Sequence, residues 1–380
     1  MRITIVTETF PPDVNGVAMT LNRIACGLQK RGHSLQIIRP QPEDPSVVNF
    51  GTLDEVQVMG FPIPGYPSLR FGLPSPRKLA HLWKENRPDA IYIATEGPLG
   101  LSALDVAEKL KIPVTSGFHT NFHQYMKHYK VPLLRNAIAG YLKWFHNRTQ
   151  TTFTPSLDML RRLDLLGFEN LQLLGRGVDT QLFSPEKRCL KLRNEWGAEE
   201  KDPVILYVGR IAAEKNLTLF AKATNLLKAK YPNLKYVIVG DGPEKESLKK
   251  DLPFAHFAGT QQGEDLAKHY ASADFFLFPS TSETFGNVVT EALASGLITL
   301  AYNYAAPKMY IEDHVNGFKV PMDKSKEFMK QALLVMASQD KWTKIRQEAT
   351  KSVQHLSWNS ILERFEKTLH FLIEQKQKAA

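Results

Sequence analysis

Cysteine is scarce in this sequence of 380 residues, which contains only Cys26 and Cys189. The two residues lie far apart, and neither belongs to a C-x-x-C motif or to a cluster with histidine. This usage supports neither a disulfide framework nor a structural zinc site. It fits the reducing cytoplasm, so we expect a cytoplasmic protein.

Long hydrophobic runs are missing as well. The first apolar stretch is too short, and too interrupted by Thr and Glu, for a signal peptide: RITIVTETFPP. No window approaches the roughly 20 apolar residues of a membrane span. The sequence therefore predicts a soluble protein or one attached peripherally to the cytoplasmic face of a membrane.

Three ligand-binding motifs are absent. No G-x-G-x-x-G occurs, since GDGPEK and GRGVDT both lack the third glycine, which argues against a nicotinamide dehydrogenase. No G-x-x-x-x-G-K-[ST] occurs, which excludes a P-loop enzyme. No D-x-D occurs, which removes the usual way of holding a sugar diphosphate through a metal ion. We expect neither a cofactor nor a bound metal.

Positive charge is in mild excess, with a formal net charge of +9 that is spread over both halves of the chain. This pattern does not favour nucleic acid as a partner. One stretch differs, because no acid lies between Glu108 and Asp158 while several cations do: Lys109, Lys111, Lys127, Lys130, Arg135, Lys143 and Arg148. Such a basic stretch, within residues 109–157, can face anionic lipid or phosphate.

What the sequence does contain is a repeated pattern of strand, helix and strand. It opens with RITIV, a helix around VAMTLNRIACGLQKRGH and SLQIIRP, and it recurs as a strand at 90–94, a helix at 99–110 and a strand at 112–117. A second series starts at PVILYVG and includes a helix at 263–272 and a strand at 274–278. This order is typical of βαβ units in a parallel sheet.

The pattern predicts an α/β fold with two Rossmann-like parallel-sheet domains. Turn residues interrupt it at 177–189, so we place the domains at 1–178 and 179–358. The last segment, 359–380, should be a docked amphipathic helix, because four apolar residues share one face: Ile361, Phe365, Leu369 and Leu372. Ligands of parallel sheets bind at the carboxyl ends of the strands, so two such domains facing each other would form a cleft lined by strand-to-helix loops.

Two loops suit an anion. Asn15 and Gly16 precede the first helix and can present backbone N–H groups, although a plain turn with left-handed angles is the alternative. Arg210 and Lys215 follow the first strand of the second domain, where two cations suit a diphosphate. The alternative is a solvated pair, with Lys215 near Glu214.

The segment SETFGNVVTEALASG, residues 282–296, is the most informative. Gly286 and Asn287 open a helix that Gly296 closes, and the helix start favours a negative charge. A carboxylate would repel a phosphate, so Glu283 and Glu291 make sense as acceptors for neutral hydroxyl groups.

A ligand with hydroxyls on both sides of a phosphate is a nucleotide sugar, with its ribose at one end and its hexose at the other. The alternative is a capping box formed by Ser280 and Glu283, with Glu291 as an ordinary surface residue.

Two further features carry an open interpretation. His119 follows the strand at 112–117 and can contact a transferred sugar, although a lone histidine is more often structural; His123 and His128 have no metal-ligand company. An apolar stripe suits either a membrane surface or, more often, core packing: Leu134, Ile138, Tyr141 and Phe145.

Together these motifs resemble the retaining glycosyltransferases of family four, which have the two-domain GT-B fold. The resemblance covers nearly the whole chain and rests on NGV, FHT, GRIAAEKN, GDGP, ASADFFLFPS and, most specifically, SETFGNVVTEALASG. It implies that the last helix crosses back to the first domain. The chain departs from many relatives at Asn15, where they have Gly, and at Pro307 and Lys308, where small residues are usual.

The resemblance also implies roles for single residues. Glu283 would contact hydroxyls of the donor sugar and Glu291 the ribose, while Arg210 and Lys215 hold the diphosphate. Gly16 would approach the diphosphate from the facing domain, and His119 would touch the donor sugar. Backbone amides would come from Phe285, Gly286, Asn287 and Val288.

The implied activity is that of a hexosyltransferase in glycolipid biosynthesis, without a metal. The segments GFPIPGYPSLRFGLPSPRKL and FHTNFHQY look most like α-mannosyltransferases and lipid-sugar transferases. Mannose transfer from GDP-mannose to a lipid-linked or glycolipid acceptor is therefore our expectation. A UDP-sugar donor, a soluble acceptor, or a protein that binds membrane or nucleic acid without catalysis are the alternatives.

Overall fold

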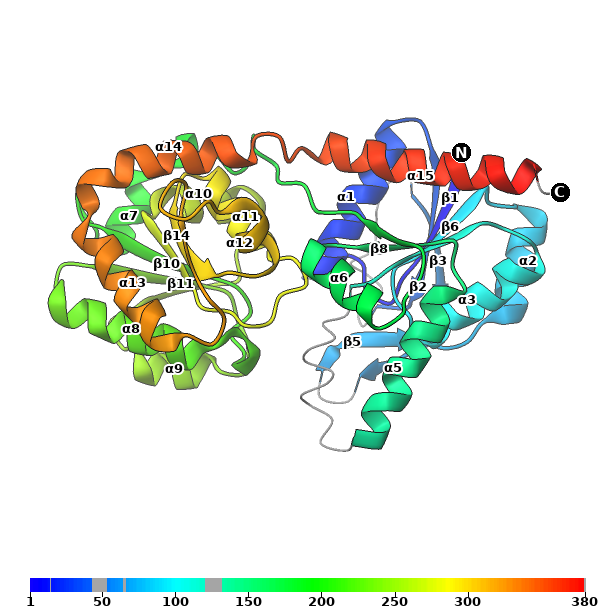
Figure 1. The fold of residues 1–380 in the computed structure, drawn as a ribbon, viewed down its shortest axis with the longest axis horizontal. Coiled ribbons are helices and arrows are strands. Elements are labelled where there is room, and N and C mark those ends of the chain that lie inside the picture. The colour runs from blue at the N-terminus through cyan, green and yellow to red at the C-terminus, as the bar shows by residue number, and fades with distance from the viewer. Residues whose placement is uncertain (14, 43–52, 64–65, 120–131, 379–380) are drawn as a thin grey trace. The chain divides into compact units, whose positions relative to one another are not determined.

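The protein is described from a computed structural model that covers residues 1–13, 15–42, 53–63, 66–119 and 132–378 (Figure 1). The chain divides into two compact units. Unit 1 holds Met1–Arg176 together with Trp358–Ala380, and unit 2 holds Gly177–Ser357. Each unit has its own parallel sheet, so the predicted α/β fold with two Rossmann-like domains is confirmed.

The described residues of unit 1 form a seven-stranded parallel sheet in the order β3-β2-β1-β6-β7-β8-β9, with a separate antiparallel pair, β4-β5. The strands are β1 (Arg2–Val6), β2 (Ser34–Pro40), β3 (Asp54–Val58), β4 (Gly60–Ile63), β5 (Tyr66–Gly72), β6 (Ala90–Ile93), β7 (Val114–Gly117), β8 (Thr151–Thr154) and β9 (Leu171–Leu173). The helices are α1 (Gly16–Lys30), α2 (Pro76–Glu85), α3 (Pro98–Lys109), α5 (Pro132–Asn147), α6 (Leu157–Leu165) and α15 (Trp358–Lys378).

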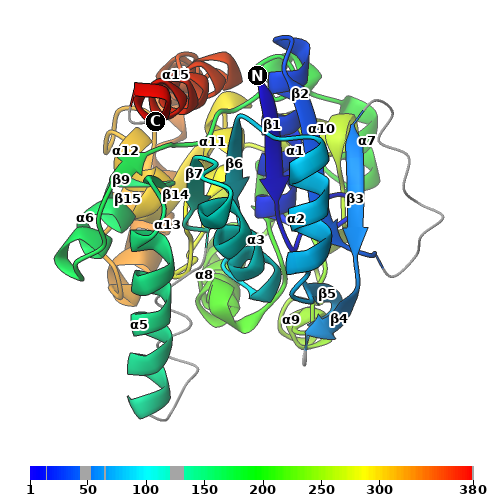
Figure 2. The same cartoon turned by 90° about the vertical axis from the view of Figure 1, so that its right-hand side faces the viewer.

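Helices cover both faces of this sheet, because successive side chains of each strand point to opposite sides. On β1, Ile3 and Ile5 join the cluster that contains α1 and α15. Val6 joins the cluster on the other side, with Trp83 of α2 and Leu104 of α3. Figure 2 shows α2 and α3 lying across that second face.

Helix α15 is the last element of the chain, and it packs into the core of unit 1. Its apolar face is buried as predicted, and Leu362 fits against Gly27 of α1, where a Cβ atom would lie 2.3 Å from Leu362 Cδ1. Glu366 accepts a hydrogen bond from Arg31 Nε at 2.6 Å and lies 2.5 Å from His33 Nε2. The helix is therefore joined to α1 by both packing and charge.

The described residues of unit 2 form a six-stranded parallel sheet in the order β12-β11-β10-β13-β14-β15. The strands are β10 (Val204–Val208), β11 (Lys235–Val239), β12 (His256–Gly259), β13 (Phe275–Phe278), β14 (Ile298–Tyr302) and β15 (Phe318–Val320). The α-helices are α7 (Leu190–Glu195), α8 (Leu217–Lys230), α9 (Lys245–Asp251), α10 (Gly263–Ser272), α11 (Asn287–Ala294), α12 (Ala305–Tyr310), α13 (Ser325–Ala337) and α14 (Trp342–Val353). Short 3-10 turns are η2 (Pro185–Lys187), η3 (Ala213–Lys215) and η4 (Gln339–Lys341).

No helix in the described part of the chain has the length and apolar character that a membrane crossing needs.

Asp274 is a buried carboxylate of unit 2 that binds three arginines. It lies directly before β13, and its Oδ2 accepts hydrogen bonds from Val204 N at 3.0 Å and Arg193 Nη1 at 3.2 Å. Its Oδ1 accepts one from Arg346 Nη1 at 3.1 Å and pairs with Arg188 Nη2 at 3.2 Å. Two neighbouring strands and two helices are thereby tied to one buried carboxylate.

Replacing Asp274 with Ala should lower the free energy of unfolding of unit 2 by about 3–5 kcal/mol, because it leaves the buried Arg193 guanidinium without its countercharge. Urea denaturation measures the loss without screening the charges. Glu246→Ala, which breaks an exposed pair with Lys249, is the control and should cost less than about 1 kcal/mol. Equal effects of the two substitutions would contradict the central role of Asp274.

Candidate active site

The loop between β13 and α11 exposes the start of a helix. Gly286 is the N-cap residue and has φ 97° and ψ 58°, a left-handed conformation that suits glycine. Asn287 and Val288 begin the helix, and N–H groups in a first turn have no acceptor within the helix. Helix α11 thus starts where the sequence predicts, and its start can hold an anion.

Glu283 lies in this loop and forms an ion pair with Lys215. Lys215 Nζ, which comes from η3 after the neighbouring strand β10, is 2.5 Å from Glu283 Oε1 and 3.3 Å from the carbonyl of Ser282. Ser280 Oγ donates to the same carboxylate oxygen at 2.8 Å. This Ser280–Glu283 bond is not the capping box considered above, because Gly286, not Ser280, caps the helix.

Arg210 lies after β10 as expected, but its partner is Glu214. The two side chains form an ion pair, and the Arg210 side chain is 44% exposed. Among the ion pairs of the described residues, Glu214 pairs with Arg210 and Lys215 pairs with Glu283. The backbone carbonyl of Arg210 accepts a hydrogen bond from Tyr207 Oη at 3.1 Å, which fixes the start of the loop.

Glu291 lies in α11 and is held by a tyrosine that sequence reasoning missed. Tyr270 Oη of α10 donates to Glu291 Oε2 at 3.0 Å. Burial, together with the Glu291 carboxylate, raises the pKa of Tyr270 well above its usual range, so the hydroxyl stays protonated. No spacing in the sequence links these two helices, and only the fold reveals the contact.

Phe285 holds the loop from inside. Its side chain is buried against the ring of Tyr310, and its carbonyl accepts a hydrogen bond from Ala306 N at 2.8 Å. Tyr304 is buried beside the same loop, and burial together with the Glu283 carboxylate raises its pKa well above the usual range. The segment that contains Pro307 and Lys308 thus supports the site loop through backbone and packing.

Asn15 excludes one alternative in unit 1. It has φ −147° and ψ 163°, an extended conformation and not the left-handed one of the alternative plain turn, because it is the N-cap of α1. Its Oδ1 accepts hydrogen bonds from Val17 N at 3.0 Å and Ala18 N at 2.9 Å. Gly16 is the first residue of α1, and its carbonyl accepts a hydrogen bond from Arg176 Nη1 at 3.0 Å.

His119 follows β7, as predicted, and lies in a cluster with Tyr92 and Arg176. Its Nε2 is 2.8 Å from Tyr92 Oη. Burial, assisted by the charge of Arg176, lowers the pKa of His119 to about 3. The imidazole is therefore neutral at physiological pH, and it can take part in hydrogen bonds without carrying a charge. His123 and His128 lie outside the described residues.

Glu8, at the end of β1, is a second residue that sequence reasoning missed. Its Oε1 accepts a hydrogen bond from Gly72 N at 3.3 Å, and a Cβ on Gly97 would lie 2.1 Å from the same oxygen. Burial, with a further contribution from Glu96, raises the pKa of Glu8 to about 7. An acid with a raised pKa at a strand end is a signal that sequence alone does not carry.

The apolar stripe on α5 belongs to the core where it is described. Phe145 is fully buried, Ile138 and Tyr141 pack against core clusters, and the side chain of Leu134 lies outside the described residues. In the basic stretch, Arg148 pairs with Glu108 at 2.5 Å and Asp105 at 2.7 Å. Core packing, the alternative that we considered more common, is therefore confirmed for the described residues of this stripe.

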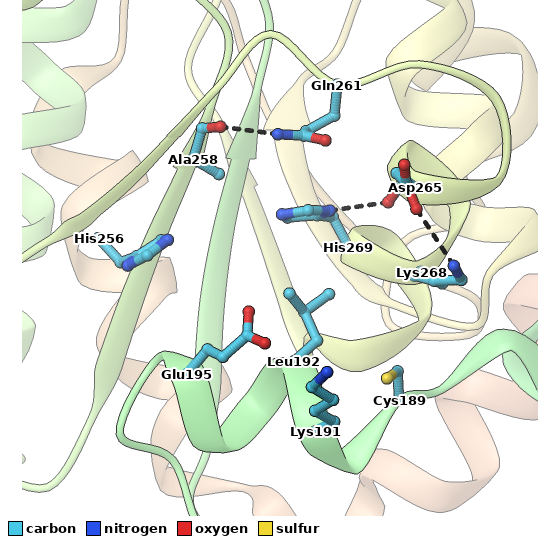
Figure 3. A pocket seen from close by; sticks show the side chains of 10 residues that line it. All are labelled: Cys189, Lys191, Leu192, Glu195, His256, Ala258, Gln261, Asp265, Lys268 and His269. Carbon is cyan, nitrogen blue, oxygen red and sulfur yellow. Dashed lines mark hydrogen bonds and ion pairs between the residues drawn. The ribbon is translucent and has the colours of Figure 1, made fainter.

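A hollow of about 440 Å³ lies elsewhere in unit 2 (Figure 3). It is lined by parts of α7, β12 and α10, and it includes none of the predicted site residues. Ala258 of β12 is one of the lining residues. The carbonyl of Ala258 already accepts a hydrogen bond from Gln261 Nε2 at 2.7 Å.

Comparison with known proteins assigns the family. Residues 14–182 match the model of Glycosyltransferase Family 4, and residues 190–352 match that of Glycosyl transferases group 1. A GDP-mannose-dependent alpha-mannosyltransferase of Corynebacterium glutamicum is 31% identical over 363 residues, which cover 95% of this chain and 86% of that protein. The chain belongs to glycosyltransferase family 4. The predicted enzyme class, a hexosyltransferase, is confirmed.

Another curated relative and two solved structures of glycosyltransferases are also similar to this glycosyltransferase. An alpha-monoglucosyldiacylglycerol synthase of Streptococcus pneumoniae is 29% identical, over 83% of this chain and 74% of that one. Anabaena HepE in complex with UDP and glucose superimposes with a TM-score of 0.77 at 19% identity, over 97% of this chain and 99% of that one. WaaG, a glycosyltransferase of lipopolysaccharide biosynthesis, has a TM-score of 0.74 at 16% identity, over 97% and 99%. The structural likenesses show the fold, which is GT-B.

Replacing Glu8 with Gln should stabilise unit 1 at pH 8 and have little effect at pH 5. The folded carboxyl has a pKa of about 7 against an ordinary 4.5, so the folded state binds the extra proton. The stability that the protonated Glu8 carboxyl contributes is lost as the pH rises from about 4.5 to 7. The Gln side chain of the variant does not ionise, so the variant avoids this loss.

Urea denaturation at pH 5, 6, 7 and 8 tests this dependence on Glu8. Replacing the exposed Glu186 with Gln is the control and should follow the wild type at every pH. A Glu8→Gln variant that is no more stable than the wild type at pH 8 would contradict the raised pKa.

Proposed function

We propose that this glycosyltransferase moves mannose from GDP-mannose to a hydroxyl of a lipid-linked or glycolipid acceptor, with retention of the α configuration. The observation that carries the proposal is the cluster of Lys215, Glu283 and the start of α11, because Lys215 pairs with Glu283 and Glu283 lies in the loop that leads into the helix N-terminus. Such a cluster offers separate partners to a phosphate and to sugar hydroxyls.

Lys215 is the residue that we assign to the diphosphate. Its ammonium group has three donors, and the described contacts use two of them, on Glu283 Oε1 and the carbonyl of Ser282. The third donor suits a phosphoryl oxygen. Arg210 and the N–H groups of Asn287 and Val288 would add further positive potential to the same group.

Glu283 is the residue that we assign to the donor hexose. Both described hydrogen bonds to its carboxylate end on Oε1, from Lys215 and Ser280. The second oxygen, Oε2, suits a sugar hydroxyl. We assign Glu291 to the ribose and, as the family resemblance implies, Gly16 to the diphosphate and His119 to the donor sugar.

The reaction we propose needs no protein nucleophile. The acceptor oxygen forms a bond to the anomeric carbon on the face that the phosphate leaves, and the bond from that carbon to the phosphate oxygen breaks. The acceptor proton passes to the departing phosphate. The protein would hold the reactants in place and stabilise the leaving group through Lys215, Arg210 and the α11 start, so that no metal is required.

The choice of donor and acceptor rests on the relatives. Those named GDP-mannose-dependent alpha-mannosyltransferase support mannose and GDP, while the alpha-monoglucosyldiacylglycerol synthases support a lipid acceptor. With a lipid acceptor, we propose that the enzyme works at the cytoplasmic face of a membrane, where the basic stretch within residues 109–157 would meet anionic lipid.

The identity of the donor is tested by thermal unfolding in the presence of GDP-, UDP- and ADP-sugars. A donor at a hundred times its dissociation constant should stabilise the fold by about 2.7 kcal/mol. We expect GDP-mannose to give the largest increase in melting temperature and ADP-glucose the smallest. A larger increase with UDP-glucose would replace mannose and GDP in the proposal.

Replacing Lys215 with Ala should lower kcat for mannosyl transfer by about 10²-fold or more, because one preorganised donor to the leaving group is lost. Transfer of labelled mannose into glycolipid vesicles is the measurement. The matched control is Lys351→Ala, which removes an exposed lysine paired with Glu348 and should leave the rate unchanged. A near-normal rate in a folded Lys215→Ala variant would overturn the diphosphate assignment.

A further inference from the structure

His119 rests on a support built from two buried residues of unit 1. Tyr92, in β6, is fully buried, and its Oη lies 2.8 Å from His119 Nε2. The two rings are nearly perpendicular, at 86°, with their centroids 6.4 Å apart. The hydroxyl thus meets the edge of the imidazole, in the direction that a hydrogen bond to a ring nitrogen requires.

The direction of this hydrogen bond follows from the partners that each group has. Burial raises the pKa of Tyr92 well above its usual range, so its hydroxyl keeps its proton. Among the described residues, His119 Nε2 is the one acceptor that this hydroxyl meets. The hydroxyl therefore donates to Nε2, which leaves Nε2 without a proton of its own. A neutral imidazole in this state carries its proton on Nδ1.

The other ring nitrogen is left for a ligand. His119 Nδ1 is buried, and it has no hydrogen-bond partner in the described part of the chain. A buried donor without an acceptor destabilises the folded protein. An oxygen atom of a bound ligand would supply the missing acceptor. The tautomer set by Tyr92 therefore presents the Nδ1–H group as a donor to a ligand.

Gly117 makes room for the contact. A Cβ atom at this position would lie 2.2 Å from Tyr92 Oη and 2.5 Å from His119 Nε2, and neither distance is possible. Tyr92 and His119 can therefore approach each other only across a residue without a side chain. Glycine is therefore required at position 117, two residues before His119, because a side chain there would occupy the space of the hydrogen bond.

The charged and titratable groups around His119 act in the same direction. Arg176 is buried, is held at the carbonyl of Gly16, and its charge lowers the pKa of His119. His146, which is also buried and neutral, adds a smaller effect of the same sign. An imidazolium is thus disfavoured, and the hydrogen bond from Tyr92 selects between the two neutral tautomers.

We propose that Tyr92 is a positioning residue that fixes His119 as the Nδ1–H tautomer, so that Nδ1 donates a hydrogen bond to an oxygen of the transferred sugar. The sugar as the recipient rests on the proposed function, whereas the tautomer does not. The sequence gives no sign of this role, because Tyr92 lies within a buried strand.

Nuclear magnetic resonance of the ring nitrogens tests the tautomer. In protein with labelled histidine at pH 7.5, the His119 signals, assigned by their loss in His119→Gln, should show a protonated Nδ1 and an unprotonated Nε2. In Tyr92→Phe and in Gly117→Ala the two tautomers should both be populated. A protonated Nε2 in the wild type would overturn the proposal, whatever reaction the enzyme catalyses.

Kinetics test whether the tautomer matters for transfer. Tyr92→Phe should lower kcat by about tenfold or more, as expected when the group that sets a histidine tautomer is removed, with little change in the KM for the donor. In the background of His119→Ala it should cause no further loss. Tyr236→Phe, which removes another buried tyrosine hydroxyl, is the matched control and should leave kcat unchanged.

The outcomes separate the two proposals. Equal losses of kcat from Tyr92→Phe with and without His119 would show a merely structural role and overturn the positioning role. The predicted tautomer in an enzyme that transfers no mannose would refute the proposed donor and leave the support of His119 intact.

Discussion

The buried carboxylate of Asp274 is the constraint on which the organisation of unit 2 depends. It ties the first residues of β10 and β13 together and neutralises the arginines of α7 and α14. Because these two strands are neighbours, the loops at their opposite ends are neighbours too, which is why Lys215 reaches Glu283. The charges at the amino ends of β10 and β13 thereby help to determine which loops lie side by side at the carboxyl ends of these strands.

The fold was predictable from periodicity. Strands buried on both faces read as apolar runs, and the predicted bounds at 90–94, 99–110 and 112–117 differ from β6, α3 and β7 by no more than two residues. The elements that had no prediction, among them β3 and the β4–β5 pair, have weaker patterns. In β3, DEVQV mixes charged and apolar residues because it lies at the edge of the sheet.

For the site, the sequence predicted the features that depend on a single loop, and it did not predict the contacts between loops. Gly286 and the start of α11 follow from local chemistry, and so did the positions of His119 and Lys215 at strand ends. The ion pair of Lys215 with Glu283 and the contact of Tyr270 with Glu291 join residues that are distant in sequence. Asn15 shows the limit within a loop, because an N-cap and a left-handed turn favour the same residue type.

The packing of Leu362 against Gly27 has a consequence for the order in which the protein is made. The core face that α1 shares with α15 includes Ile3 and Leu21 from the first residues of the chain and Phe365 from the last helix. During synthesis on the ribosome, that face stays open until the whole of unit 2 has been translated. A nascent chain therefore carries an incomplete first domain for most of its synthesis, and the second domain is the first that can close its own core.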